Sequence, residues 1–160
     1  MKCDIETIEA DLLALVKTNI AAKLSEIETE KADGLTLAVP TDAQYFDSTD
    51  IDEQVVNQDL LVKHGLVESD VLSISTANAE QNTYIFLVYL TNLNAPQGEM
   101  RKKLFRYIRA LKEIFQENFD AFPYLSRLDV SVIAPAIWAE NEQSPAYKVG
   151  GIYIQTTLAG

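Results

Sequence analysis

Tyr84-Ile-Phe-Leu-Val-Tyr-Leu90 is the longest apolar run in this sequence of 160 residues. Apolar and polar side chains do not alternate within it, which is typical of a strand that is covered on both faces. We therefore predict that residues 83–91 form a central strand of a β-sheet. The run is seven residues long, whereas a helix that crosses a membrane needs about 20, so we expect no membrane-spanning helix.

A partner strand is predicted directly before this run. Apolar residues alternate with serine over 71–76, which is the pattern of a half-buried strand. The polar residues 78–82 include two asparagines and predict the turn of a β-hairpin. Further upstream, Lys63-His64-Gly65 is also predicted to be a turn.

Two amphipathic helices are predicted on either side of the hairpin. Apolar residues recur at spacings of three and four over 4–31, and Asp4 is a suitable N-cap. The second helix is predicted over 99–119. Its apolar stripe consists of Leu104, Ile108, Leu111, Phe115 and Phe119, and is widened by Phe105, Tyr107 and Ile114. This width favours contact of the second helix with two surfaces, one of them outside the subunit.

The remaining strands complete the prediction of the fold. Strands are predicted at 35–39, 45–46, 125–134 and 147–158, the third ending at Pro135 and the last bent at Gly150-Gly151. This order of elements predicts an α+β fold, in which a mainly antiparallel or mixed β-sheet is flanked by two main helices. No linker or internal repeat interrupts it, so we expect a single domain over 1–160.

Charge is distributed unevenly along the chain. The net charge is −11, with 17 acidic and 5 basic residues in 1–98 but 7 acidic and 8 basic residues in 99–160. Residues 40–59 contain six acidic residues and no Lys or Arg, which predicts an exposed acidic loop. Six of the thirteen basic residues lie in 101–112. One interpretation is a molecule with two unlike faces that docks head to tail, on copies of itself or on partners; the other is ordinary solvated surface charge.

The sequence contains no catalytic, cofactor-binding or metal-binding signature. His64 is the single histidine and Cys3 the single cysteine, so the chain lacks the ligands of a structural zinc site. No glycine-rich phosphate-binding motif is present. We therefore expect a protein that is not an enzyme and that has no cofactor.

The order and length of the elements resemble the small tail-terminator and tail-completion (neck) proteins of long-tailed bacteriophages and prophages. The resemblance covers most of 5–33 and 83–158. It is carried by the strand at 84–90, the helix at 101–119, the strand at 128–134, a polar loop with Trp138, and the closing strand at 147–158. Residues 40–70 do not contribute to it.

The resemblance implies a structural protein of the virion, made in the cytoplasm of the host bacterium. Members of this family form a ring, usually a hexamer, that caps the completed tail tube and ends its polymerisation. The ring also presents a surface to the head-side connector, and DNA passes through its central hole without specific binding. The implied partners are thus copies of the same chain, the tail tube protein and the neck proteins, with no enzymatic activity, no cofactor and no membrane.

A ring requires two different patches that meet at each subunit boundary. As a hypothesis, Arg101, Lys102, Arg106 and Arg109 of one subunit face Asp50, Asp52 and Glu53 of the next. Two other interpretations stay open. One is an acidic binding or regulatory module that acts as a chaperone or as a nucleic-acid mimic. The other is a different neck component, such as a head-closure or stopper protein.

Overall fold

The computed structural model describes residues 4–47, 59–74, 77–91, 97–138 and 147–159. The helices are α1 (Ile5–Lys31) and α2 (Gln97–Glu117), with short 3-10 turns at Asp42–Gln44 and Phe119–Ala121. The strands are β1 (Tyr45–Asp47), β2 (Leu60–Ile74), β3 (Ala77–Leu90), β4 (Leu125–Trp138) and β5 (Tyr147–Ala159). The predicted α+β class is confirmed, because the two helices accompany a mixed five-stranded sheet.

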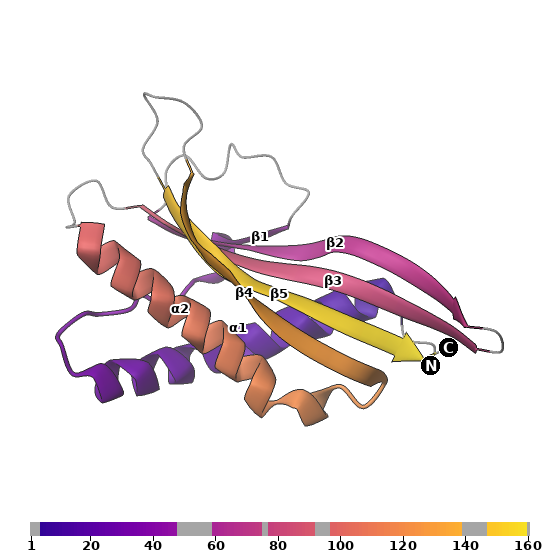
Figure 1. Ribbon diagram of the computed structural model, residues 1–160. Helices are drawn as coiled ribbons and strands as arrows, with labels where there is room; N and C mark the ends of the chain where they lie inside the picture. Colours follow the sequence, from indigo (N-terminus) through magenta and orange to yellow (C-terminus); the bar gives the residue numbers. More distant parts are fainter. Residues whose placement is uncertain (1–3, 48–58, 75–76, 92–96, 139–146, 160) are drawn as a thin grey trace.

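The strands lie in the order β1-β2-β3-β5-β4 (Figure 1). β1 runs parallel to β2, and every other neighbouring pair is antiparallel. β3 is the third of the five strands, which confirms the central position predicted from its apolar run. Its alternate residues Tyr84, Phe86 and Val88 belong to the core beneath the helices, and Tyr89 is buried on the opposite face.

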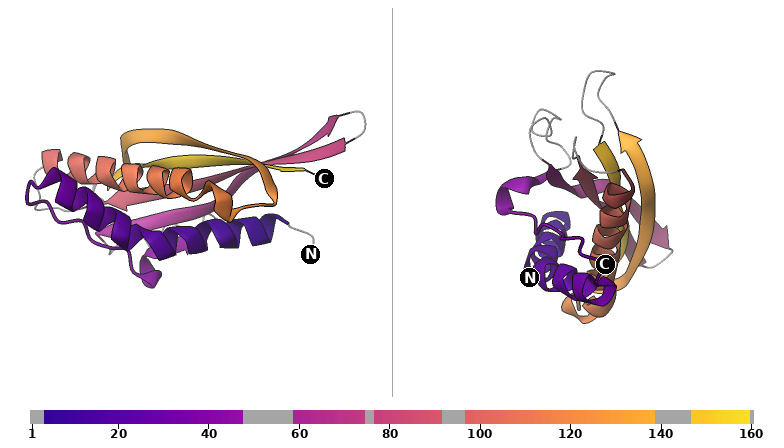
Figure 2. Two further views of the ribbon diagram at one scale, coloured as in Figure 1. Left: turned by 90° about the horizontal axis from the view of Figure 1, so that it is seen from below. Right: turned by 90° about the vertical axis from the view of Figure 1, so that its left-hand side faces the viewer.

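Both helices cover the same face of the sheet (Figure 2). α1 begins at the predicted cap, where the backbone N–H of Thr7 donates to Asp4 Oδ1 at 2.9 Å. It ends at Ala32, which adopts a left-handed conformation with φ 47°. The apolar stripe of α1 is buried and consists of Ile8, Leu12, Val16, Ile20, Leu24 and Ile27. Because these residues recur at helical spacing, they all point toward the sheet and α2.

The apolar side of α2 is also buried, with one exception. Leu104, Ile108, Leu111 and Phe115 pack in the core, and so do Tyr107 and Ile114. Phe119 was predicted to continue this stripe, but it lies beyond the end of α2 in a 3-10 turn and is 45% exposed. Phe105 points away from the core and is 46% exposed. Of the residues that widen the apolar side of α2, Tyr107 and Ile114 therefore pack within the subunit, and Phe105 is exposed to solvent.

The hairpin is longer than predicted. The predicted turn at 78–82 is wrong, because these residues belong to β3 and pair with Ser69 to Ser73 of β2. Polar composition here does not mark a turn: Asn82 is buried within the sheet and hydrogen-bonded to Ser69 and Glu80. The predicted turn at His64 is also wrong. His64 lies within β2, opposite Phe86, and stacks on that ring at 6.3 Å between centroids.

The strand predicted at 35–39 is not formed. These residues pair with no strand among the described residues, and two of their backbone groups bond to side chains instead. The backbone N–H of Leu37 donates to a carboxylate oxygen of Glu28, and the hydroxyl of Tyr107 donates to the carbonyl of Ala38. The strand predicted at 45–46 is confirmed as β1. Residues 48–58, most of the predicted acidic loop, lie outside the described residues.

The two C-terminal strands differ from prediction at their bend. β4 does not end at Pro135 but continues to Trp138, with a bulge between Ile133 and Ala136. β5 stays in register with β3 through Gly150 and Gly151, so the predicted irregularity lies in β4 and not in β5. A Cβ atom on Gly151 would stand 1.9 Å from the carbonyl oxygen of Phe86, so only glycine fits there.

Candidate interaction surface

The basic cluster of α2 is divided into two groups by its contacts. Arg106 and Arg109 face α1 and the segment after it, whereas Arg101, Lys102 and Lys112 are exposed and Lys103 is half-buried. The hypothesis that Arg101, Lys102, Arg106 and Arg109 face the next subunit places all four side chains on the outside of the subunit. That placement is wrong for Arg106, whose side chain is only 8% exposed.

Arg106 forms a two-point ion pair with Asp33. Its Nη1 donates to Asp33 Oδ1 at 2.9 Å, and its Nη2 donates to the other carboxylate oxygen. This hydrogen-bonded guanidinium lowers the pKa of Asp33 to about 2. Asp33 follows the end of α1, so the pair fixes the path of the chain as it leaves that helix.

Arg109 binds two carboxylates of the same chain. Its terminal nitrogens donate to the two oxygens of Glu30 at 2.9 and 2.6 Å, and its Nε donates to Glu113 Oε1 at 2.9 Å. The hydrogen bond from Arg109 lowers the pKa of Glu30, and the two carboxylates together raise the pKa of Arg109. Arg109 thus joins the middle of α2 to the last turn of α1.

Lys23 is a third cation at this helix interface, and sequence reasoning missed it. Its Nζ lies 2.7 Å from Glu117, 3.1 Å from Glu26 and 3.8 Å from Glu113, measured to the nearest carboxylate oxygens. The hydrogen bond to Glu117 is the main cause of its raised pKa. Its position offered a signal, because Lys23 lies three residues after Ile20 and four before Ile27, within the buried stripe of α1.

The other cations of α2 differ from Arg106 and Arg109. No ion pair joins Arg101, Lys102, Lys103 or Lys112 to any other residue that the structure describes. The guanidinium carbon of Arg101 lies 5.4 Å from the ring centre of Phe105, a cation–π contact on the outer side of the helix. We call Arg101, Lys102, Lys103 and Phe105 the α2 cationic tip.

The predicted acidic counterparts Asp50, Asp52 and Glu53 lie outside the described residues. Their pairing with α2 therefore stays a prediction. Among the described residues, exposed acids occur in the second half of β2, at Glu68 and Asp70. Glu68 pairs with Thr83 and Asp70 with Gln81 across the hairpin, so no cation stands opposite either one.

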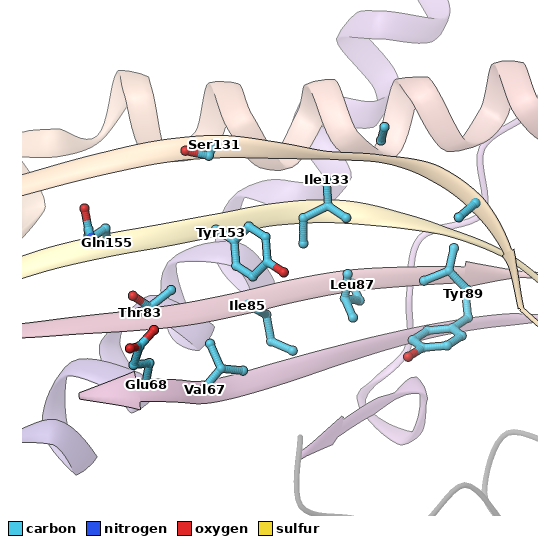
Figure 3. Close-up of a pocket in the computed structure, with 13 residues that line it drawn as sticks. Val67, Glu68, Thr83, Ile85, Leu87, Tyr89, Ser131, Ile133, Tyr153 and Gln155 are labelled. Atoms are coloured by element: carbon cyan, nitrogen blue, oxygen red, sulfur yellow. The ribbon is translucent and has the colours of Figure 1, made fainter. Parts of the chain in front are cut away.

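The face of the sheet that the helices leave uncovered carries a shallow apolar groove of about 790 Å³. Figure 3 shows Val67, Ile85, Leu87, Ile133 and Tyr153 lining it from four strands. Glu68, Thr83 and Gln155 form a polar margin at one end. Sequence reasoning did not identify this groove, although the lost alternation in 84–90 is consistent with apolar residues on both faces of β3.

The groove offers an apolar surface for contact. Its ionisable lining residues are Glu68, Tyr89 and Tyr153, which do not form a nucleophile with a base. Within the described ranges, no three or more His, Cys, Asp or Glu residues are grouped so that they could hold a metal ion. The same ranges include no helix that is both long and apolar enough to cross a bilayer.

Neither models of known protein families nor curated proteins match this sequence.

Proposed function

We propose that this chain is a tail-terminator-like assembly protein of a long-tailed phage or prophage, which forms a ring by head-to-tail contact between identical subunits. The observation that supports it best is the division of the α2 cations. Arg106 and Arg109 are bound within the subunit, while the cations of the α2 cationic tip have no ion-pair partner among the described residues. A heterologous interface requires such an unmatched patch, because it must meet a different patch on the next copy.

The shape of the subunit is compatible with this role. The molecule is elongated, with the start of α2 at one end and the tip of the β2–β3 hairpin at the other (Figure 1). Two patches that lie far apart cannot satisfy each other within one subunit. They can do so in a closed ring, in which every subunit donates one patch and receives the other.

In the proposed role the ring sits on the end of the completed tail tube and stops its polymerisation. It also joins the tube to the head-side connector, with DNA passing through the central hole. A net charge of −11 supports passage without retention, because the surplus of negative charge repels the phosphate backbone. The chain requires no catalytic group for any of these steps.

The experiment that tests the function combines mass and capping. Light scattering after size exclusion is expected to give a mass near six subunits, or a shift from monomer to ring on addition of tail tubes. Tubes polymerised with the protein present are expected to be shorter and blocked at one end in electron micrographs. Tubes of unchanged length, without protein at their ends, would contradict the proposal whatever the oligomeric state.

A second candidate function is an acidic binding module, and the uncovered apolar groove favours it. A groove of this size, lined by Val67, Leu87 and Tyr153, suits a single segment of a partner protein. A stable monomer that binds one cellular protein and ignores tail tubes would support this candidate. A head-closure or stopper role would instead give binding to the head-side connector without binding to tubes.

A further inference from the structure

The α2 cationic tip is arranged to receive an anionic partner. Lys102 and Arg106 are four residues apart on one helix, so their like charges repel each other weakly. Asp33 offsets the charge of Arg106, but none of the described residues does this for Lys102. Phe105 adds an exposed aromatic ring beside these cations, and an aromatic ring next to arginine is typical of the centre of protein interfaces.

The second half of β2 has the complementary character. Glu68 and Asp70 are exposed and lie two positions apart, so they share one face of the strand. No Lys or Arg occurs between Lys63 and Arg101, which leaves the whole hairpin beyond His64 without a cation. Val67 is 48% exposed beside these acids. We call Val67, Glu68 and Asp70 the hairpin acidic edge.

Among the described residues, no strand covers this edge. In the part of the chain that the structure describes, β1 pairs with Val62, Lys63 and His64, so β2 is an outer strand of that sheet from Glu68 onward. Acidic side chains on an open edge discourage pairing with an arbitrary strand. The same acids attract positively charged side chains, such as those of the α2 cationic tip.

The two surfaces lie in opposite halves of the molecule. Both Figure 1 and the left view of Figure 2 place the start of α2 at one end and the β2–β3 tip at the other. The two surfaces of one chain therefore cannot meet.

We propose that the α2 cationic tip of one copy binds the hairpin acidic edge of the next copy. Phe105 packs on Val67, and Arg101 and Lys102 face Glu68 and Asp70. This inference rests on the proposed function only in that both require self-association.

The test is a charge exchange between two variants. The first is Arg101→Glu/Lys102→Glu, which makes both surfaces acidic. The second is Glu68→Lys/Asp70→Lys, which makes both surfaces basic. Each variant alone is expected to self-associate at least about tenfold more weakly than the parent chain at low salt. A mixture of the two restores both contacts, and an even-numbered ring can alternate them around its circumference.

Association is measured by sedimentation velocity and by titration of one labelled variant with the other, up to about 1 mM subunit. Binding between the two variants, with weak self-binding of each, would support the proposal even if the parent protein closes into a ring only on a tail tube. Absence of binding between the variants over this range would overturn it. So would restoration by a third variant, Asp50→Lys/Asp52→Lys, in place of the hairpin variant.

Two comparisons separate this result from simpler causes. Lys112→Glu makes the same charge change as Lys102→Glu on the same helix, about 15 Å further along its axis, and is expected to leave association unchanged. Circular dichroism establishes that each variant is folded. Capping of tail tubes is scored separately, so a variant pair that binds without capping tubes would refute the proposed function and leave this interface in place.

Discussion

The two groups of cations on α2 differ in what they bind, although they are continuous in the sequence. Arg106 and Arg109 bind Asp33, Glu30 and Glu113 of their own chain. Arg101 and Lys102 are exposed and have no ion-pair partner among the described residues. A run of basic residues is thus two structural features, one that holds the helices together and one that is available to a partner.

The difference arises from the position of each residue along α2 relative to α1. Arg109 and Glu113 lie beside the last turns of α1, where Glu30 is available. Arg106 lies beside Asp33, just after α1 ends. Arg101 lies before this region, and no residue of α1 is recorded in an ion pair with it. Helical spacing alone cannot separate the two groups, because Lys102, Arg106 and Arg109 share one side of α2.

The largest effect on stability is expected from Arg106→Ala. This change removes a side chain that is only 8% exposed and leaves Asp33 without its partner, so the melting temperature should fall by about 5 °C. Differential scanning calorimetry measures it. Lys102→Ala, one helical turn earlier, is the control and should leave the melting temperature unchanged. If both variants lowered the melting temperature equally, the cations bound within the subunit would not differ from the exposed ones in their contribution to stability.

The ion pair between Arg106 and Asp33 should also change how the free energy of unfolding depends on pH. Arg106 lowers the pKa of Asp33 to about 2 in the folded chain, whereas an unfolded Asp titrates near 3.9. Its contribution is therefore present above about pH 4 and is lost as the pH falls toward 2. Asp33→Asn should flatten this part of the curve of unfolding free energy against pH. Equal slopes for Asp33→Asn and the parent chain would contradict the assignment.

A smaller effect is expected from Arg109→Ala. Arg109 is more exposed than Arg106, and exposed ion pairs contribute little because solvent screens them. The melting temperature should fall by about 2 °C, and 1 M salt should reduce the difference from the parent chain. Thermal unfolding followed by circular dichroism at two salt concentrations tests both points. A fall in melting temperature as large as that of Arg106→Ala would mean that burial does not determine how much these ion pairs stabilise the fold.

The smallest effect on stability is expected from Arg101→Gln/Lys102→Gln. These side chains have no ion-pair partner within the described part of the chain, so the melting temperature should change by about 1 °C or less. Self-association at low salt should nevertheless weaken. Sedimentation velocity beside calorimetry on the same samples shows whether the two properties separate. A marked loss of stability would place these cations with Arg106 and not with a partner surface.

The sequence predicts the locally determined parts of this fold well. Asp4 caps α1, the stripe of α1 is buried, and 84–90 is the middle strand, because spacing and composition within each segment decide these features. The prediction of a strand at 35–39 is wrong because the side chains of Glu28 and Tyr107 bind the backbone there. The turn at 78–82 fails for a related reason: Asn82 is fully buried and hydrogen-bonded to Ser69 and Glu80, which residue type alone does not reveal.

The candidate site is less accessible to sequence reasoning than the fold. The cluster in 101–112 is visible from composition, yet Arg106 and Asp33 are 73 positions apart in the chain, and local patterns carry no information on such a pair. The groove beside Val67 and Tyr153 requires four strands to be placed side by side. Its prediction therefore depends on the strand order, which the pattern of single segments does not specify.

The place of β5 in the sheet has a consequence for how the protein is made. β5 follows every other described strand in chain order, yet it lies between β3 and β4. While the ribosome is still adding residues after Trp138, β4 has been synthesised but has no neighbouring strand with which to pair. The nascent chain thus holds an unpaired strand with apolar residues until Tyr147–Ala159 emerges. Completion of the sheet therefore waits until β5 has been translated, and until then the apolar residues of β4 are open to aggregation or to binding by a chaperone.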